Sequence, residues 1–216
     1  MAKRNFSRPY KKQTGYPSYA IVSDGETEKW YFQLMKEAEG VRSYITYRCN
    51  LKGSLEKVYS QVVDILKDEY TRVFWIIDYD VVIKEEREFR GDGLSPLQRL
   101  KKILEEADDR YHSQLQVVFN NPCLEFWYLL HYIQTNRCYL KYEGELKRKL
   151  LSFIPKYDKT ETFYKNKNLY LMLKDKQKFA IQNSRALDSF DLDNVEHACA
   201  DIYKVVEFFL GTAPRQ

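Results

Sequence analysis

The chain has 216 residues, of which 44% are hydrophobic and 31% charged, and its formal net charge at pH 7 is +4. This balance is typical of a folded globular protein and excludes an intrinsically disordered chain, while the length suffices for one domain or for a core with an appended helical part. No stretch approaches the ~20 apolar residues of a membrane span, the first residues lack the apolar core of a secretory signal, and the cysteines form no C-x-x-C pair, so we expect a cytoplasmic protein without a disulfide framework or a zinc site.

The predicted elements begin after residues 1–16, which contain five Lys or Arg and no acid and which we interpret as a flexible basic arm. Residues 18–24 form a short apolar run that ends in an acid and is followed by a glycine, as expected of a buried strand. Residues 26–40 have apolar side chains four residues apart, which is the spacing of a helix, and Gly40 is expected to end that helix.

Two strands and a helix follow. Residues 44–50 alternate between side-chain types as a strand does. Residues 54–70 have the apolar stripe of an amphipathic helix, with Ser54 as its N-cap. Residues 72–78 include five consecutive apolar residues of β-branched and aromatic types, a run too short for a helix, and they are the strongest strand candidate.

A polar stretch with two glycines, residues 81–94, is interpreted as a loop. A helix over residues 96–109 precedes a fourth strand over residues 115–121. Residues 122–133 are apolar nearly all round, so we expect a buried helix with Pro122 at its first position.

Strands and helices thus alternate four times, which predicts an α/β fold with a parallel, Rossmann-like sheet, right-handed crossovers and helices on both faces. After residue 135 no strand is predicted. Basic helical segments fill residues 144–188, and an amphipathic helix spans residues 195–210. The chain divides into a flexible basic arm (1–16), an α/β core (17–135) and a basic, mainly helical C-terminal part packed on the core (136–216).

The charge is unevenly distributed along the chain. Residues 141–185 contain twelve basic and five acidic residues, whereas residues 17–140 and 186–216 each have a net charge of −4. A basic arm and a basic C-terminal segment beside an acidic centre suit DNA or RNA held across a metal site. The alternative is a solvated tail with charged helix faces. On the first interpretation, Lys and Arg of residues 141–185 flank an acidic cleft together with the arm.

Four acids define that acidic centre. In a parallel sheet the ligand site lies beyond the carboxyl ends of the strands. The first strand ends at Asp24, and Glu28 lies in the first turn of the next helix. Asp78 and Asp80 end the third strand and share one face, because strand side chains alternate. If the first and third strands are neighbours, these four carboxylates converge.

Such a cluster favours metal chemistry. Like charges a few ångströms apart raise one another's pKa, so the site either takes up protons or binds a cation. Oxygen ligands favour Mg²⁺ or Mn²⁺, which can activate water and stabilise the charge on a phosphodiester. Each acid also has a structural alternative, because acids in the first turn of a helix serve its dipole, and Asp24 or Glu26 could cap the helix.

Three stretches resemble the RloB family of Toprim-like proteins and, more distantly, the nuclease half of OLD-family proteins. They are VSDGETEKWYF (22–32), FWIIDYD (74–80) and NNPCLEFWYLLHY (120–132), the last being the most distinctive. A fainter match at YDK (157–159), followed by a helix over residues 180–187, extends the resemblance over most of the chain.

The resemblance implies a Toprim-like fold in which Asp24, Asp78 and Asp80 hold Mg²⁺, and by analogy with the OLD branch Glu28 joins them. The family usually shows Glu where this chain has Asp24. An Asp side chain is one methylene shorter, so ligation there is either direct or through water, or Glu26 contributes. The family is associated with bacterial anti-phage defence, often beside an ATPase gene, which implies a partner ATPase.

Three further residues of the matching stretches need separate consideration. Glu125 lies in an otherwise apolar helix, where a carboxylate without a partner is costly, so it is either a site residue or a structural acid. His131 is interpreted as a core or helix-surface histidine. Lys159 could stabilise the scissile phosphate, although it lies in a segment rich in lysine.

Two functions follow. The first is a metal-dependent Toprim-like nuclease that cuts DNA or RNA as the toxic effector of a defence system, with Asp24, Glu28, Asp78 and Asp80 as metal ligands and Glu125 and Lys159 as further catalytic candidates. The alternative is a degenerate module that binds nucleic acid or a partner ATPase without cleavage. Three aromatic residues near the C-terminus either support a homo-oligomer or pack on the sheet: Tyr203, Phe208 and Phe209.

Overall fold

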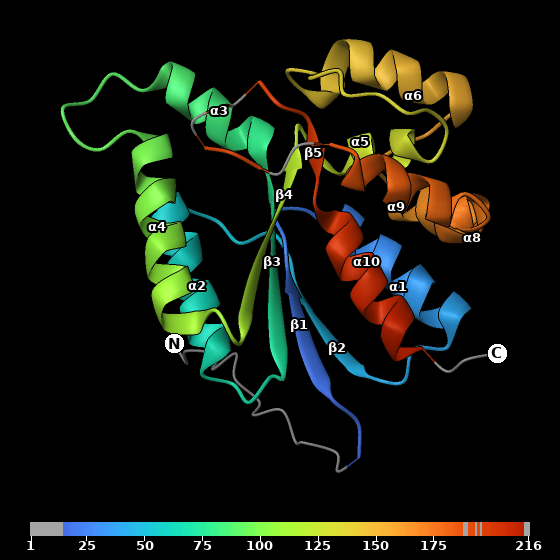
Figure 1. Ribbon diagram of the computed structural model, residues 1–216, viewed down its shortest axis with the longest axis horizontal. Helices are drawn as coiled ribbons and strands as arrows, with labels where there is room; N and C mark the ends of the chain where they lie inside the picture. The colour runs from blue at the N-terminus through green and yellow to red at the C-terminus, as the bar shows by residue number, and fades with distance from the viewer. Residues whose placement is uncertain (1–14, 188–189, 193, 195, 214–216) are drawn as a thin grey trace, which may run out of the picture.

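The computed structural model describes residues 15–187, 190–192, 194 and 196–213, so the predicted basic arm lies outside the described residues except for its last two. The described residues form a five-stranded sheet with the strand order β2-β1-β3-β4-β5 (Figure 1). The strands are β1 (Ser18–Val22), β2 (Tyr44–Arg48), β3 (Arg72–Asp78), β4 (Leu115–Asn121) and β5 (Cys199–Ala200). The first four run parallel, and β5 runs antiparallel to β4.

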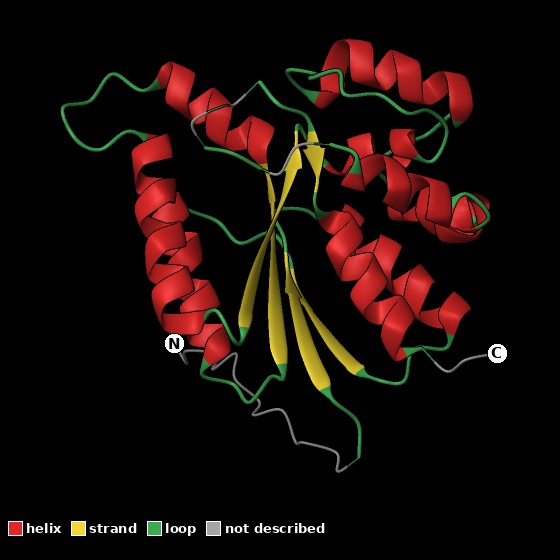
Figure 2. Ribbon diagram, in the orientation of Figure 1, coloured by secondary structure: helices red, strands yellow, loops and turns green. Residues whose placement is uncertain are grey.

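Helices cover both faces of this sheet, which confirms the predicted α/β fold (Figure 2). One face carries α2 (Leu55–Leu66), α3 (Tyr79–Glu88) and α4 (Pro96–Tyr111), and the other carries α1 (Thr27–Glu39) and α10 (Ile202–Thr212). Alternate residues of each strand supply the two cores, because strand side chains point to opposite faces. In β3, Trp75 packs in the first core and its neighbours Phe74 and Ile76 pack in the second.

The remaining helices pack against α1 or around α5 (Leu124–Leu130), every residue of which is buried. They are the short π-type turn η1 (Tyr142–Leu146), α6 (Lys147–Phe153), α7 (Glu161–Lys167), α8 (Leu169–Lys174) and α9 (Gln177–Arg185). Helix α8 packs against α1, and α9 packs against α5. The basic C-terminal part therefore shares one hydrophobic core with the sheet. No helix of the described chain is long and apolar enough to cross a membrane.

The elements that carry the predicted site begin and end close to the expected residues. Strand β1 lies between β2 and β3, and Val22 at the end of β1 is level with Trp75 of β3. Gly40 ends α1, and its φ of 64° lies in the left-handed region that favours glycine. The carboxyl ends of β1 and β3 therefore meet at the same edge of the sheet.

Two predicted boundaries near this edge are wrong. Residues 81–88 belong to α3 and not to a polar loop, because Tyr79 and Val82 lie three residues apart and are both buried against the sheet. Pro122 is not the first residue of the following helix. It follows a cis peptide bond, and α5 begins two residues later with Cys123 as its N-cap.

The C-terminal part contains a strand that was not predicted. Strand β5 pairs Ala200 with Asn120 and Cys199 with Asn121. The last helix therefore begins at Ile202 and not at residue 195. A strand of two residues is too short to show a periodicity, and it exists because the outer edge of β4 is available for pairing.

Two aromatic residues of α10, Phe208 and Phe209, pack on the sheet. Phe209 is 1% exposed, and its ring centroid lies 5.5 Å from that of Tyr19 and 5.6 Å from that of Phe74. Phe208 contacts the same two rings. Packing on the sheet, one of the two roles open to the aromatic residues near the C-terminus, is therefore shown for Phe208 and Phe209, whereas the Tyr203 ring lies 5.9 Å from the guanidinium of Arg185.

Truncation of Leu130 tests the packing around α5. Leu130 is fully buried, so Leu130→Ala should lower the free energy of unfolding by about 2–5 kcal/mol. The matched control is Leu140→Ala, because Leu140 is 68% exposed, and its effect should stay within about 0.5 kcal/mol. Chemical denaturation measures both values, and equal effects would contradict the described core.

Candidate functional site

The turn after β1 places two acids at the carboxyl edge of the sheet. The Ser23 hydroxyl donates a hydrogen bond to the Gly25 carbonyl oxygen at 2.8 Å, which holds this turn. Asp24 lies in the turn and is exposed, whereas Glu28 in the first turn of α1 is only 3% exposed. The Thr27 hydroxyl donates to Glu28 Oε2 at 3.1 Å. One predicted acid is thus at the rim of the site and the other in its interior.

The next two acids follow β3. Asp78 is the last residue of β3, and Asp80 lies in the first turn of α3. The extended geometry predicted for this pair is therefore wrong, because the chain turns into α3 directly after Asp78. Asp78 Oδ1 accepts hydrogen bonds from Asn120 Nδ2 at 3.3 Å and from the Leu124 backbone N–H at 3.1 Å. The Asp80 backbone N–H donates to the Pro122 carbonyl oxygen at 3.1 Å.

Glu125 and Lys159 form an ion pair beside these acids. Glu125 is completely buried, and its Oε2 lies 2.9 Å from Lys159 Nζ. Its Oε1 accepts a hydrogen bond from the Tyr157 hydroxyl at 2.8 Å. The Lys159 ammonium also lies 4.3 Å from the centroid of the Tyr142 ring. These partners compensate the burial of the carboxylate, and they bring Lys159 into the site.

Asn120 is a site residue that the sequence analysis did not identify. It is completely buried, lies opposite Asp78 in the sheet and donates to that carboxylate. Its Oδ1 has no hydrogen-bond partner among the described residues, although most buried amide oxygens have one. The available signal was its place in the sequence, because Asn120 is the first residue of the third matching stretch.

The buried acids raise one another's pKa. The pKa of Glu28 is raised to about 7, first by burial and then by the charges of Glu125 and Asp24, while hydrogen bonds lower it. The pKa of Asp78 is raised well above its usual value, again first by burial. Four other acids add to this rise: Glu28, Glu125, Asp80 and Asp24. All the predicted acids therefore act on one another electrostatically.

The two acids at the rim follow the same rule. The pKa of Asp24 is raised to about 6, first by burial and then by the charges of Asp80 and Glu85. Although Asp24 is an exposed residue, protein surrounds most of its carboxyl group. Burial also raises the pKa of Asp80, and the Lys159 ammonium opposes this rise. A cation near these groups would lower every one of these pKa values.

The donors of this site suit a hard divalent cation, since they are carboxylate oxygens and the unpartnered amide oxygen of Asn120. Among the described residues, however, no group of three or more Asp, Glu, His or Cys side chains is close enough together to hold a metal ion. The predicted gathering of four carboxylates within reach of one ion is therefore not present in this arrangement. Asp24 and Asp78 nevertheless lie at the same edge of the sheet and influence each other's charge.

A groove of about 640 Å³ opens beside the acids, between α3 and residues 140–143. Asp80 lines it, so the groove reaches the acidic site. Four cationic side chains also line it: Lys84, Arg87, Lys141 and Lys159. Glu88 and Glu143 line the groove as well as Asp80, so the cationic side chains exceed the acidic ones by one, and this small excess favours an anion.

His131 lies away from these groups. It is 1% exposed, and its Nδ1 lies 2.9 Å from the Trp127 carbonyl oxygen. Burial is the main cause that lowers the pKa of His131 to about 4, so the ring is neutral at physiological pH. The interpretation of His131 as a core histidine is confirmed.

Comparison with known families identifies the chain. The model of the RloB-like protein family matches residues 19–209. The chain belongs to the RloB-like family. Comparisons with curated proteins and with solved structures found no significant match.

The motifs of this RloB-like protein meet at one edge of the sheet. Residues 22–32 form the turn from β1 into α1, residues 74–80 lead from β3 into α3, and residues 120–132 contain α5. The fainter match at residues 157–159 supplies two partners of Glu125, a tyrosine and a lysine. Segments far apart in the chain thus combine into one site.

The raised pKa values predict that the metal-free protein loses stability as pH rises. A carboxyl group with a higher pKa in the folded than in the unfolded chain binds its proton more tightly when folded. Below about pH 4 both states are protonated and the group has no differential effect. Stability then falls as pH rises towards the folded pKa, about 7 for Glu28, so the melting temperature in EDTA should fall from about pH 5 to pH 7.5.

Two matched variants isolate this effect. Glu28→Gln removes one of the titrating groups and should flatten the fall in melting temperature. Glu105→Gln, at an exposed position of α4, should keep the wild-type slope. Identical slopes for the wild type and both variants would contradict the raised pKa of Glu28.

Proposed function

We propose that this RloB-like protein is a metal-dependent, Toprim-like nuclease that hydrolyses phosphodiester bonds in DNA or RNA. The observation that carries the proposal is the set of acids at the carboxyl edge of the sheet whose pKa values are raised together. Such acids either take up protons at neutral pH or bind a cation. Oxygen donors favour Mg²⁺ or Mn²⁺ as that cation.

Asp24, Glu28, Asp78 and Asp80 are the proposed metal-holding residues. A bound divalent ion would supply a Lewis acid that activates water and neutralises the phosphate. The hydrogen bonds from Asn120 and the Leu124 N–H fix the orientation of the Asp78 carboxylate. For Asp24 to join them, its side chain would have to turn from the rim of the site towards the acids of the interior.

Glu125 positions Lys159 for a role at the phosphate. Burial lowers the pKa of Lys159, but the Glu125 carboxylate and other nearby groups raise it more, so the ammonium stays charged. The Lys159 side chain is still 41% exposed and lines the cationic groove. It can therefore stabilise negative charge that develops on a phosphodiester there.

Only some basic residues of the C-terminal segment are placed where they could bind a polyanionic substrate. Lys141 and Lys159 line the groove, together with Lys84 and Arg87 of α3, which the sequence analysis did not single out. Several other basic side chains of residues 141–185 pair with acids and contribute less positive charge. These pairs are Lys147–Glu143, Lys165–Glu161, Lys174–Glu39 and Arg185–Glu207.

The second candidate is a degenerate Toprim-like module that binds nucleic acid or a partner ATPase without cleavage. Two observations favour it. No three metal-ligating side chains of the described chain converge on one point, and Asp24, where the family usually has Glu, is exposed. Glu26, the other acid of that turn, pairs with Lys29 at 3.1 Å.

A role in bacterial anti-phage defence beside a partner ATPase follows from the family resemblance alone. It is the setting in which a toxic nuclease would act. Cells that express the chain with its neighbouring genes should survive phage challenge better than cells that express the same genes with Asp78→Asn. Equal survival would remove the link between the acidic site and defence.

Asp78→Asn separates the two candidate activities. In the metal-free protein this change relieves repulsion, so the melting temperature should stay the same or rise. Mg²⁺ should stabilise the wild type by mass action and the variant much less. Cleavage of labelled DNA or RNA by the variant should fall at least about a hundredfold.

The matched control is Asp109→Asn, at an exposed position of α4, which should keep both the Mg²⁺ response and the cleavage. A wild type that gains no stability from Mg²⁺ and cuts nothing, yet binds nucleic acid, would support the degenerate module. An Asp78→Asn protein that melts lower and still cuts normally would show that the acids are structural.

Lys84→Ala and Arg87→Ala test the cationic groove. Each phosphate contact releases counterions, so each change should weaken nucleic-acid binding and lower the slope of log Kd against log salt by about one. Lys101→Ala, at an exposed position of α4, should change neither. Fluorescence anisotropy over a series of salt concentrations measures both quantities, and binding that ignores salt would argue for a protein as the main ligand.

A further inference from the structure

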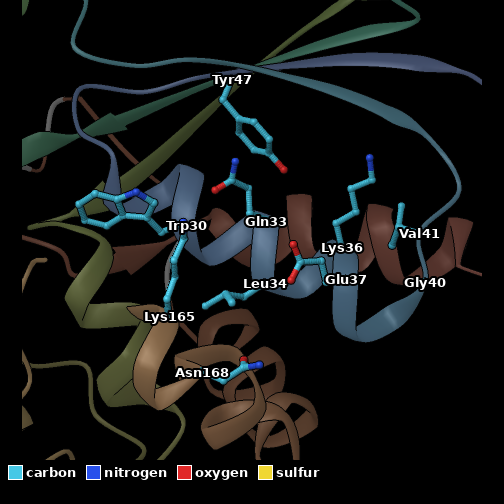
Figure 3. Close-up of a pocket in the computed structure, with 10 residues that line it drawn as sticks. All are labelled: Trp30, Gln33, Leu34, Lys36, Glu37, Gly40, Val41, Tyr47, Lys165 and Asn168. Carbon is cyan, nitrogen blue, oxygen red and sulfur yellow. The ribbon is translucent and has the colours of Figure 1, made fainter. Parts of the chain in front are cut away.

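A second groove, of about 900 Å³, runs along the outer face of α1. Figure 3 shows the ring of Tyr47 reaching from β2 towards Gln33 and Lys36 of α1, while Trp30 and Lys165 lie together at one end. Pockets that bind small organic ligands have volumes of ~300–1,000 Å³. None of the acids of the candidate active site lines this groove, so it is a separate place for a ligand.

Two buried polar groups on its walls have no hydrogen-bond partner among the described residues. They are the indole N–H of Trp30, a residue only 9% exposed, and the hydroxyl of Tyr47. The indole N–H can only donate. Burial, followed by Cys49 and Glu37, raises the pKa of Tyr47, so its hydroxyl keeps its proton. Buried donors without acceptors are unfavourable, and an occupant that offers acceptors would satisfy them once either ring turns towards the groove.

The charged and amide side chains restrict the chemistry of that occupant. Lys36 forms no ion pair with a described residue, whereas Lys165 pairs with Glu161 at 2.7 Å. Glu37 and the amide of Gln33 also line the groove and offer hydrogen-bond acceptors. A ligand with an anionic group for Lys36 and a polar, uncharged ring for the other side chains matches this set.

Aromatic contacts connect the groove to the acidic site. The ring centroids of Trp30 and Tyr164 lie 5.4 Å apart. The Tyr164 hydroxyl lies 2.8 Å from that of Tyr157, which donates to Glu125. Trp30 also follows Glu28 by two residues on α1. One end of the groove therefore lies next to the acids.

We propose that this groove binds an unpaired nucleotide, with its base against Tyr47 and its phosphate at Lys36. Ring nitrogens and carbonyl groups of a base offer acceptors to Trp30 and Tyr47, and an exocyclic amino group offers a donor to Glu37. Stacking on an aromatic side chain accepts any base. A base paired within a duplex cannot enter, so the source is a single strand or a free nucleotide. The proposal goes beyond the nuclease activity, because this binding needs no metal.

The test is a binding titration of the full chain in EDTA, which excludes metal-dependent cleavage. The probes are a fluorescent single-stranded oligonucleotide, the same sequence as a duplex, and AMP. Tyr47→Phe should weaken single-strand binding about fivefold, as expected for the loss of one hydrogen bond, and should leave duplex binding unchanged. Lys36→Gln should weaken it most at low salt and lower the salt slope by about one, so that the difference from the wild type shrinks as salt rises. If AMP binding alone responds to both changes, the source is a free nucleotide.

Two controls distinguish binding from folding. Tyr59→Phe removes another buried hydroxyl without a described partner, in the core on the opposite face of the sheet, and Lys102→Gln removes an exposed charge on α4. Neither should change the affinity for the single strand. Tyr47→Phe should unfold at the same denaturant concentration as the wild type or a higher one, since its hydroxyl has no described partner. If Tyr47→Phe and Lys36→Gln both bind AMP and the single strand with wild-type affinity, the proposal is overturned and the groove binds no nucleotide.

Discussion

Crowded negative charge at the carboxyl edge of the sheet is the constraint on which the rest of the site depends. Burying like charges together raises the free energy of the folded protein unless hydrogen bonds, cations or protons compensate. Asp78 is compensated by two hydrogen bonds from the end of β4 and the start of α5. Glu125 is compensated by residues 157–159, which return from the C-terminal part. The C-terminal helices thus complete a site that the sheet alone would leave unbalanced.

A chain of tyrosine hydroxyls leads from the buried Glu125 carboxylate into the core. The hydroxyls of Tyr128 and Tyr164 lie 3.1 Å apart, and Tyr164 contacts Tyr157 beside Glu125. Burial raises the pKa of all three, so they remain protonated and able to donate. Several of the 18 Tyr of the chain therefore serve as hydrogen-bonding residues in the interior. The same network borders the groove beside Trp30, while the cationic groove opens on the α3 side of the acids.

Much of the fold could be predicted because its signals are local. The runs at residues 18–24 and 72–78 are apolar and short, as buried strands are. The helix after the first run ends at Gly40, and glycine adopts the left-handed conformation of a helix end without help from distant residues. Alternation of strands with helices then implies a parallel sheet with its ligand site at the carboxyl ends. Asp24 and Asp78 could be placed at one edge for this reason alone.

Periodicity and chain order are therefore enough to predict the fold class, the edge that carries the site and the acids at that edge. Packing between distant segments places Asp80 in a helix, Asn120 beside Asp78 and Lys159 beside Glu125. The pairing of β5 with β4 has the same origin. Each of these depends on contacts between segments distant in the chain, and such contacts leave no periodic pattern in either segment.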